Sequence, residues 1–332
     1  MTDDARSAPA QPVTANSDAD PLTVATLVAR RAPSFLNTQP WRWRRTADAA
    51  ELWLDRDRQL TGMDPDGRLA TMSCGVALHH ALTALRASGR GGIVHRPGTD
   101  APADLVAVLR TGPPCEIDDR AFDALASRRT DRRPFSGTPP TTADLDPLRE
   151  AAERHGAHLY VLTPRQVPAF ARSLSEARLR ERIGAVTAAE LADWTDRPGG
   201  SGDGVAARRH DPRGLRSDDV GFSRTPWMAL GESAHAGTVY VVLHTDGDRP
   251  ADWLAAGEAL SDVWLTLTER GLAASPLSEV VEVPAVRASM RQLIGGAGHP
   301  MIALRIGVPG GSAGPPTARR AAPDVIELSD DR

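Results

Sequence analysis

The chain is 332 residues long, which is enough for about two domain-sized units with a full hydrophobic core. Its composition, 41% apolar and 25% charged, is that of an ordinary globular protein, and no segment approaches the roughly 20 uninterrupted apolar residues of a membrane span. All 39 basic residues are arginine, and 43 acidic residues leave a net charge of -4. These values exclude an integral membrane protein and argue against a surface that attracts nucleic acid.

The cysteines and the first residues indicate the compartment. Cys74 and Cys115 lack the paired spacing of a metal site or a disulfide framework, and no basic and apolar signal segment opens the sequence. We therefore expect a cytoplasmic protein in a reducing environment. Residues 1–19 are small, polar and contain proline, so we expect a disordered arm there.

Regular elements are predicted from residue 20 onward. Asp20 followed by Pro21 is typical of a helix N-cap with proline in the first turn, and apolar residues continue at helical spacing. Five strand-like runs separated by helical stretches follow, at 51–55, 105–110, 158–163, 238–245 and 301–306. This mixture predicts the α+β class.

Two long helices are predicted to be copies of each other. They span 68–88 and 251–270, and each ends at a glycine suited to the left-handed position after a helix. An ungapped alignment pairs Gly75, Ala77, Leu78, Leu85 and Gly89 with Gly257, Ala259, Leu260, Leu267 and Gly271. Both helices also lead to a strand that ends Leu-Arg-x-Gly. We infer a diverged tandem duplication with halves over 20–118 and 119–332; the alternative is chance similarity between helices rich in Ala, Leu and Gly.

The segment 195–225 is charged, contains six glycines and is longer than a usual connection. Two interpretations stay open for it, a functional lid and a plain solvated loop.

Several common chemistries have no motif here. The sequence contains no GxxxxGK[ST], no GxGxxG after a strand, no HExxH, no GxSxG and no CxxC pair. The nine histidines are scattered, and the neighbours His79 and His80 lie on an apolar helix, where packing is the expected role. We therefore expect no hydrolase, no nucleotide triphosphatase and no metal site.

Residues 32–43 (APSFLNTQPWRW) are the first of three segments that suit one ligand. Ser34, Asn37 and Gln39 stand beside two tryptophans, and prolines stiffen the backbone. Side-chain amides both donate and accept hydrogen bonds, as the edge of a flavin ring requires, and hydroxyls suit a ribityl chain. The alternative role is a structural loop anchored by tryptophan.

The other two segments are rich in arginine. RRTDRRPF contains Arg128, Arg129 and Arg132, whose forked donors suit a phosphate dianion. Arg319 and Arg320 follow the last predicted strand in PPTARRAAPDVIEL. The alternative for such a run is a solvated charged face.

Together these motifs resemble those of the nitroreductase superfamily of FMN-dependent oxidoreductases. APSFLNTQPWRW with RRTDRRPF in mid-chain is similar to the Acg-like branch, in which two nitroreductase halves are fused, and the resemblance covers about residues 20–325. It implies a nitroreductase-like fold, an internally duplicated pseudo-dimer with helices around antiparallel or mixed sheets. It also implies an FMN site that includes Ser34, Asn37, Gln39, Pro40, Trp41, Arg42, Arg128, Arg129, Arg132, Arg319 and Arg320.

The same resemblance assigns two further segments. Residues 275–284 match the loop that passes beside the flavin, with Pro276, Leu277 and Ser278 facing the ring, and 195–225 match the branch's lid. The main departure is Leu36, where Acg-like members often have histidine.

The order of the motifs indicates one site per chain. The N-terminal half has no Arg-Arg-Ser/Thr segment before Ala32, and the C-terminal half has AAERHGAHLYVL where a second APSxxNxQPW would stand. The loop around Asn37 and the arginines at 128–132 lie in opposite halves, so they can meet across the internal interface. We expect one FMN between the two halves of a monomer.

The expected function is an FMN-dependent oxidoreductase of the nitroreductase type, with NAD(P)H and a small-molecule electron acceptor as partners. A missing catalytic triad is no objection, because the cofactor carries the electron chemistry. The first alternative is a protein that sequesters or stores FMN under an occluding lid and has no acceptor. A non-flavin scaffold that kept the fold is the second alternative.

Overall fold

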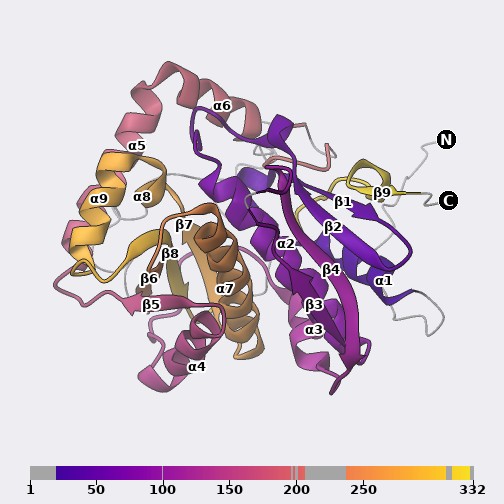
Figure 1. Cartoon of the computed structure of the whole chain (residues 1–332). Coiled ribbons are helices and arrows are strands. Elements are labelled where there is room, and N and C mark those ends of the chain that lie inside the picture. Colours follow the sequence, from indigo (N-terminus) through magenta and orange to yellow (C-terminus); the bar gives the residue numbers. More distant parts are fainter. Residues whose placement is uncertain are drawn as a thin grey trace, which may run out of the picture.

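The computed structural model describes residues 20–98, 100–195, 197–198, 201–205, 237–311 and 316–329. The predicted N-terminal arm and residues 206–225 of the predicted lid lie outside these ranges. Two β-sheets flank a central pair of helices (Figure 1), which confirms the α+β class and the arrangement of helices around antiparallel and mixed sheets.

The first sheet has five strands and combines the early part of the chain with its C-terminal end. Its strands are β1 (Trp41–Arg45), β2 (Ala49–Leu54), β3 (Arg90–His95), β4 (Leu105–Pro114) and β9 (Ile326–Leu328). The order is β3-β4-β2-β1-β9, and neighbours are antiparallel except β1 and β9, which run parallel. The last strand of the chain therefore returns from the predicted C-terminal half to complete the sheet of the other half.

The second sheet has four antiparallel strands. They are β5 (Ala157–Val161), β6 (Val239–Thr245), β7 (Ala273–Leu277) and β8 (His299–Gly307), in the order β5-β6-β8-β7. All five predicted strand runs are confirmed. The predicted loop at 275–284 is wrong in its local structure, because β7 and the short helix α8 (Glu279–Glu282) occupy most of it. Pro276 is tolerated because β7 is an edge strand of this sheet.

The helices pack around and between the sheets. Besides α8 they are α1 (Pro21–Ala29), α2 (Arg68–Ala87), α3 (Asp119–Ser127), α4 (Thr142–Glu153), α5 (Val167–Ile183), α6 (Ala185–Thr195), α7 (Pro250–Glu269) and α9 (Pro284–Leu293). The predicted N-cap is confirmed, since Asp20 Oδ2 accepts from the amide of Thr23 at 2.9 Å. No helix in the described ranges is long and apolar enough to cross a membrane.

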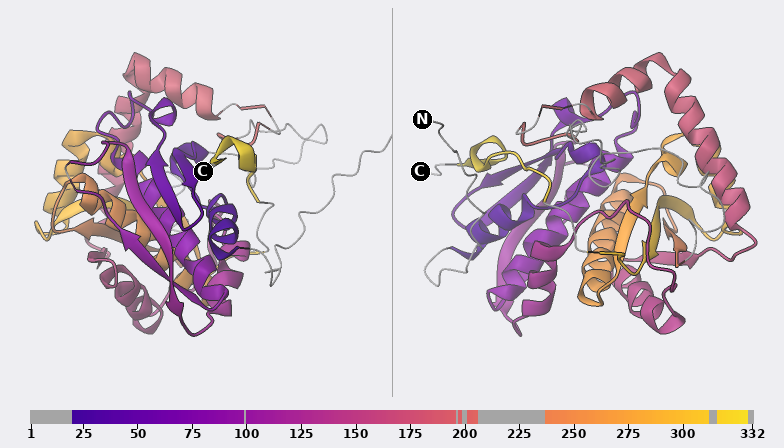
Figure 2. Two further views of the ribbon diagram at one scale, coloured as in Figure 1. Left: turned by 45° about the vertical axis from the view of Figure 1, so that its right-hand side comes forward. Right: turned by 180° about the vertical axis from the view of Figure 1, so that it is seen from behind.

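Helices α5 and α6 form an arm that spans the two halves (Figure 2). Its far end is fixed to the N-terminal half by Glu190, whose carboxylate accepts hydrogen bonds from the amides of Gly62 and Met63 at 2.9 and 3.0 Å. Trp194 is buried beside it with Leu60. The arm thus joins the halves on one side of the central helices.

The central pair, α2 and α7, meets at two glycines that the sequence alignment pairs with each other. A Cβ on Gly75 would collide with the carbonyl of Leu254, and one on Gly257 would collide with the carbonyl of Met72. Met72 and Leu254 are also aligned positions, so the contact repeats with the two helices exchanged. The glycines that follow the helices, Gly89 and Gly271, both have φ of +71°, as predicted. These features support the internal duplication.

Candidate functional site

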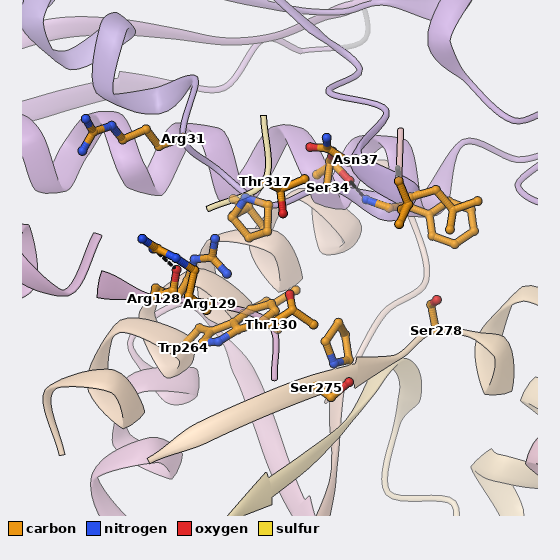
Figure 3. Close-up of a pocket in the computed structure, with 18 of the residues that line it drawn as sticks. Arg31, Ser34, Asn37, Arg128, Arg129, Thr130, Trp264, Ser275, Ser278 and Thr317 are labelled. Atoms are coloured by element: carbon orange, nitrogen blue, oxygen red, sulfur yellow. Dashed lines mark hydrogen bonds between the residues drawn. The ribbon is translucent and has the colours of Figure 1, made fainter. Parts of the chain in front are cut away.

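A cavity of about 1040 Å³ lies between the two halves (Figure 3). Residues of α2 and α7 line it from the central pair, and the end of α1, the turn after α3, strand β7 and residues 316–319 contribute further walls. Ligand pockets commonly measure about 300 to 1,000 Å³, so the cavity has room for a large organic ligand.

The structure brings the three predicted segments together at this cavity. Nine of the predicted site residues line it: Ser34, Asn37, Arg128, Arg129, Arg132, Pro276, Leu277, Ser278 and Arg319. They come from both halves of the chain. In Figure 3, Ser34 and Asn37 face Thr130, Trp264 and Ser275 across the cavity, with Arg128 and Arg129 toward one end and Ser278 toward the other.

Five predicted residues do not line the cavity: Gln39, Pro40, Trp41, Arg42 and Arg320. The amide of Gln39 instead ties three segments together. Its Nε2 donates to the carbonyls of Gly202 at 2.8 Å and Asn37 at 3.3 Å, and its Oε1 accepts from the amide of Arg320 at 3.0 Å. Gln39 therefore supports the loop that carries Asn37.

The end of the motif passes into the first sheet and leaves the cavity. Trp41 begins β1 and is fully buried in the core. Arg42 is the next residue of the strand, so it points to the opposite face, where its Nε pairs with Asp55 at 2.9 Å. The carbonyl of Pro40 accepts from the amide of Asp55 at 3.1 Å. This part of the motif anchors the loop to the sheet.

The loop itself has an uncommon backbone. Leu36, Asn37 and Gln39 have φ of 44°, 56° and 51°, in the left-handed region that costs energy for residues other than glycine. Asn37 Nδ2 donates to the carbonyls of Gly204 at 2.9 Å and Ala318 at 3.2 Å, which fix this conformation. Strain of this kind concentrates at binding sites.

Three arginines create a strongly cationic end of the cavity. Arg128 is buried, and its Nε and Nη1 have no hydrogen-bond partner among the described residues. Burial, followed by repulsion from Arg319 and Arg129, lowers the pKa of Arg128 to about 9. Burial and the charges of Arg129 and Arg31 lower the pKa of Arg319 to about 10. Clustered cations with unfilled donors are the chemistry of an anion site.

Arg31 and Trp264 also line this end and are not among the predicted site residues. Arg31 lies two residues after the end of α1, and its carbonyl accepts from Arg319 Nη2 at 3.1 Å. Two adjacent arginines directly before the APSFLN motif are the sequence signal for it. Trp264 carried no such signal, because an aromatic residue at helical spacing is typical of an ordinary core position.

The opposite end of the central pair has a different composition. The alignment places Glu258 opposite Val76, and Asp262 opposite His80. Glu258 accepts from Arg96 Nη2 at 2.7 Å. Val76 of α2 lines the cavity, whereas the aligned position of α7 carries the acidic side chain of Glu258.

These two carboxylates bind His155 of the AAERHGAHLYVL segment. Its Nε2 lies 3.0 Å from Asp262, and its Nδ1 lies 3.6 Å from Glu258. Burial opposes the charge of His155, but the hydrogen bonds to Asp262 and Glu258 outweigh it and raise its pKa to about 9. His79, His155 and Asp262 each place an atom that could bind a metal within 4.8 Å of the others. Arg154 also pairs with Asp262 at 3.0 Å, so the carboxylates already have cationic partners from the protein.

Comparison with known proteins identifies the family of the chain. The nitroreductase family profile matches residues 125–308, and the chain belongs to that family, in its Acg-like branch.

The chain is similar to each of the following three proteins. "Putative NAD(P)H nitroreductase Rv3131" of Mycobacterium tuberculosis (strain ATCC 25618 / H37Rv) is 36% identical over 324 residues, which cover 93% of this chain and 92% of that protein. "Putative NAD(P)H nitroreductase acg" of the same strain is 30% identical over 321 residues, with 93% and 96% covered. The crystal structure of the FMN and NADPH-dependent nitroreductase NfnB from sphigopyxis sp. strain HMH is 23% identical, with 63% and 98% covered and a TM-score of 0.42.

Proposed function

We propose that the chain binds one FMN in the cavity between its halves and acts as an NAD(P)H-dependent oxidoreductase of the nitroreductase type. The observation that carries the proposal is Arg128, a buried guanidinium beside Arg129 and Arg319 that has two donors for which no described residue is an acceptor. A buried cation among like charges is costly unless an anion pairs with it. The phosphate of FMN supplies two negative charges at this place.

The remaining lining residues fit the rest of such a ligand. Ser34 and Asn37 offer a hydroxyl and an amide on one side, and strand β7 with Ser278 borders the cavity on the other. Bound FMN supplies the acceptance of hydride from a nicotinamide and the transfer of electrons to an acceptor. The part of the protein is to orient the ring and to exclude water, which needs no acid–base triad.

One site per chain is supported by the contrast between the two ends of the central pair. At the end equivalent to the cavity, Glu258 and Asp262 bind Arg96, Arg154 and His155. An ion network of this kind fills the place of a second ligand. Because both halves of the remaining site belong to one polypeptide, the proposal includes a monomer.

FMN storage without turnover is the second candidate. Val205 lines the cavity, and the carbonyl of Gly204 binds Asn37, so the start of the predicted lid lies at the site. Residues 206–225 of that segment fall outside the described residues.

Anaerobic stopped-flow spectroscopy separates the two candidates. Protein loaded with FMN is mixed with NADPH, and the flavin absorbance is followed; a nitroaromatic or a quinone is then added. If the protein is an oxidoreductase, NADPH should bleach the flavin absorbance and the acceptor should restore it. Bleaching by dithionite but not by NADPH would reject it in favour of storage. Free FMN mixed with NADPH in the same way is the control.

A further inference from the structure

We propose that Trp264 is a positioning residue that holds the guanidinium of Arg128 in the orientation required by a phosphate-bearing ligand. The inference rests on the proposed function and adds a role for an aromatic side chain. Trp264 lies on α7, is almost completely buried and lines the cavity. The guanidinium carbon of Arg128 lies 4.7 Å from the centre of its ring, within the range of a cation–π contact.

The neighbouring arginines are held in another way. Arg129 Nη1 donates to the carbonyls of Ala126 at 2.7 Å and Arg128 at 2.8 Å. Arg319 donates to three carbonyls, including that of Arg31 at 3.1 Å. No carbonyl among the described residues accepts from Nε or Nη1 of Arg128. The ring of Trp264 is therefore the contact that fixes the plane of this guanidinium while those donors stay available.

The charges around Arg128 make such a contact necessary. Arg129 and Arg319 repel it, and burial removes the water that would otherwise solvate it. The negative face of an indole ring attracts a cation without consuming its N–H donors. Loss of the ring would free the Arg128 side chain to turn away from its neighbours.

The internal duplication offers a comparison within the same chain. With Gly75 aligned to Gly257, Trp264 corresponds to Leu82 on α2; Trp264 lines the cavity and Leu82 does not, so the aromatic ring stands in the copy whose side chain reaches the cavity at this position. Trp253, also on α7, contacts Arg68 at 5.1 Å, but Arg68 is already paired with Asp248. Trp253 is therefore a matched control, a tryptophan on the same helix that stacks on a satisfied arginine away from the cavity.

The test compares the dissociation constants of FMN and riboflavin, measured by fluorescence titration, in wild-type protein and in Trp264→Leu, Trp264→Phe and Trp253→Leu. For Trp264→Leu we expect FMN binding to weaken about tenfold more than riboflavin binding. Trp264→Phe retains a ring and should recover most of that difference, and Trp253→Leu should show none. In an Arg128→Met background, Trp264→Leu should cause no further phosphate-specific loss.

Equal losses for FMN and riboflavin in Trp264→Leu, or the same difference in Trp253→Leu, would overturn the proposal. Should Trp264→Leu not fold, Trp264→Met fills similar space without a ring and is judged by the same ratio. If wild-type protein binds no FMN, the proposed function fails by itself. The positioning of Arg128 is then tested by thermal unfolding with inorganic pyrophosphate. We expect pyrophosphate to stabilise the wild-type protein but not Trp264→Met. Equal stabilisation of both proteins, or stabilisation of neither, would refute the proposed role of Trp264.

Discussion

Replacing Arg128 with methionine should raise the stability of the ligand-free protein and weaken its binding of FMN. Methionine keeps an unbranched side chain against Trp264 but removes the charge. The two effects have opposite signs. Without a ligand, the buried charge of Arg128 lowers the stability of the fold, because no described residue accepts from two of its donors. With FMN bound, a phosphate can accept these hydrogen bonds, so the same charge strengthens binding. If Arg128 had only a structural role, its replacement should lower both the stability of the ligand-free protein and the affinity for FMN.

The structure sets the size of each effect. Burial, together with repulsion from Arg319 and Arg129, lowers the pKa of Arg128 from its ordinary value to about 9, and at about 1.36 kcal/mol per pKa unit this costs the folded protein at most about 5 kcal/mol at neutral pH. The replacement also removes the cation–π contact with Trp264, which contributes about 2 kcal/mol to stability, and some packing, so the net gain in stability is smaller. We expect the free energy of unfolding to rise by about 1 to 2 kcal/mol. Charge-assisted hydrogen bonds contribute about 1.5 to 3 kcal/mol each, so FMN should bind at least tenfold more weakly.

Urea unfolding of the ligand-free protein gives the first quantity, and titration with FMN and with riboflavin gives the second. Riboflavin lacks the phosphate, so its affinity should change little. Arg120→Met, at an exposed position of α3, is the control and should leave both quantities unchanged. A ligand-free Arg128→Met protein that is less stable than wild type, or equal loss of both ligands, would refute the reasoning.

Three further predictions concern the fold. Gly75→Ala puts a methyl group against the backbone of α7 and should lower the free energy of unfolding by about 1 to 3 kcal/mol, whereas Gly98→Ala meets nothing within 4 Å and should not; equal effects would contradict the close helix contact. Because the folded state raises the pKa of His155 from 6.5 to about 9, its stabilisation is complete below pH 6.5 and lost as the pH rises through 9, so wild type should lose up to about 3 kcal/mol relative to His155→Gln over that range in urea titrations. A constant difference across those pH values would reject a charged His155. Sedimentation should give a mass near 35.4 kDa, and a tight dimer would mean that chains share sites.

Much of the fold could be predicted because its strongest elements have clear periodicity. The five predicted strands alternate or are continuously apolar, and the central helices end at left-handed glycines. Strands β1, β3, β7 and β9 were not predicted; β1 begins at the end of the APSFLNTQPWRW segment, which was interpreted only as a ligand motif. Arg90–His95 contains two glycines, Ala273–Leu277 contains proline, and Ile326–Leu328 is only three residues long, so tertiary pairing rather than local preference makes them strands.

The candidate site could be predicted as a set of segments but not residue by residue. The residue types indicated that Asn37 and Arg128 serve one ligand, and both line the cavity. The type of an amide does not tell which partner it meets, so Gln39, which binds backbone carbonyls, could not be told apart from Asn37 beforehand. Trp264 was missed because its role comes from Arg128, which approaches it from a distant part of the chain.

The flavin content of the purified protein tests the central claim most directly. The protein is saturated with FMN, freed of excess ligand by gel filtration and denatured, and the released flavin is identified by chromatography and counted against the protein concentration. The cationic cavity between the halves and its ion-filled counterpart predict FMN at close to one molecule per chain. Two molecules per chain, or none after reconstitution, would contradict the account.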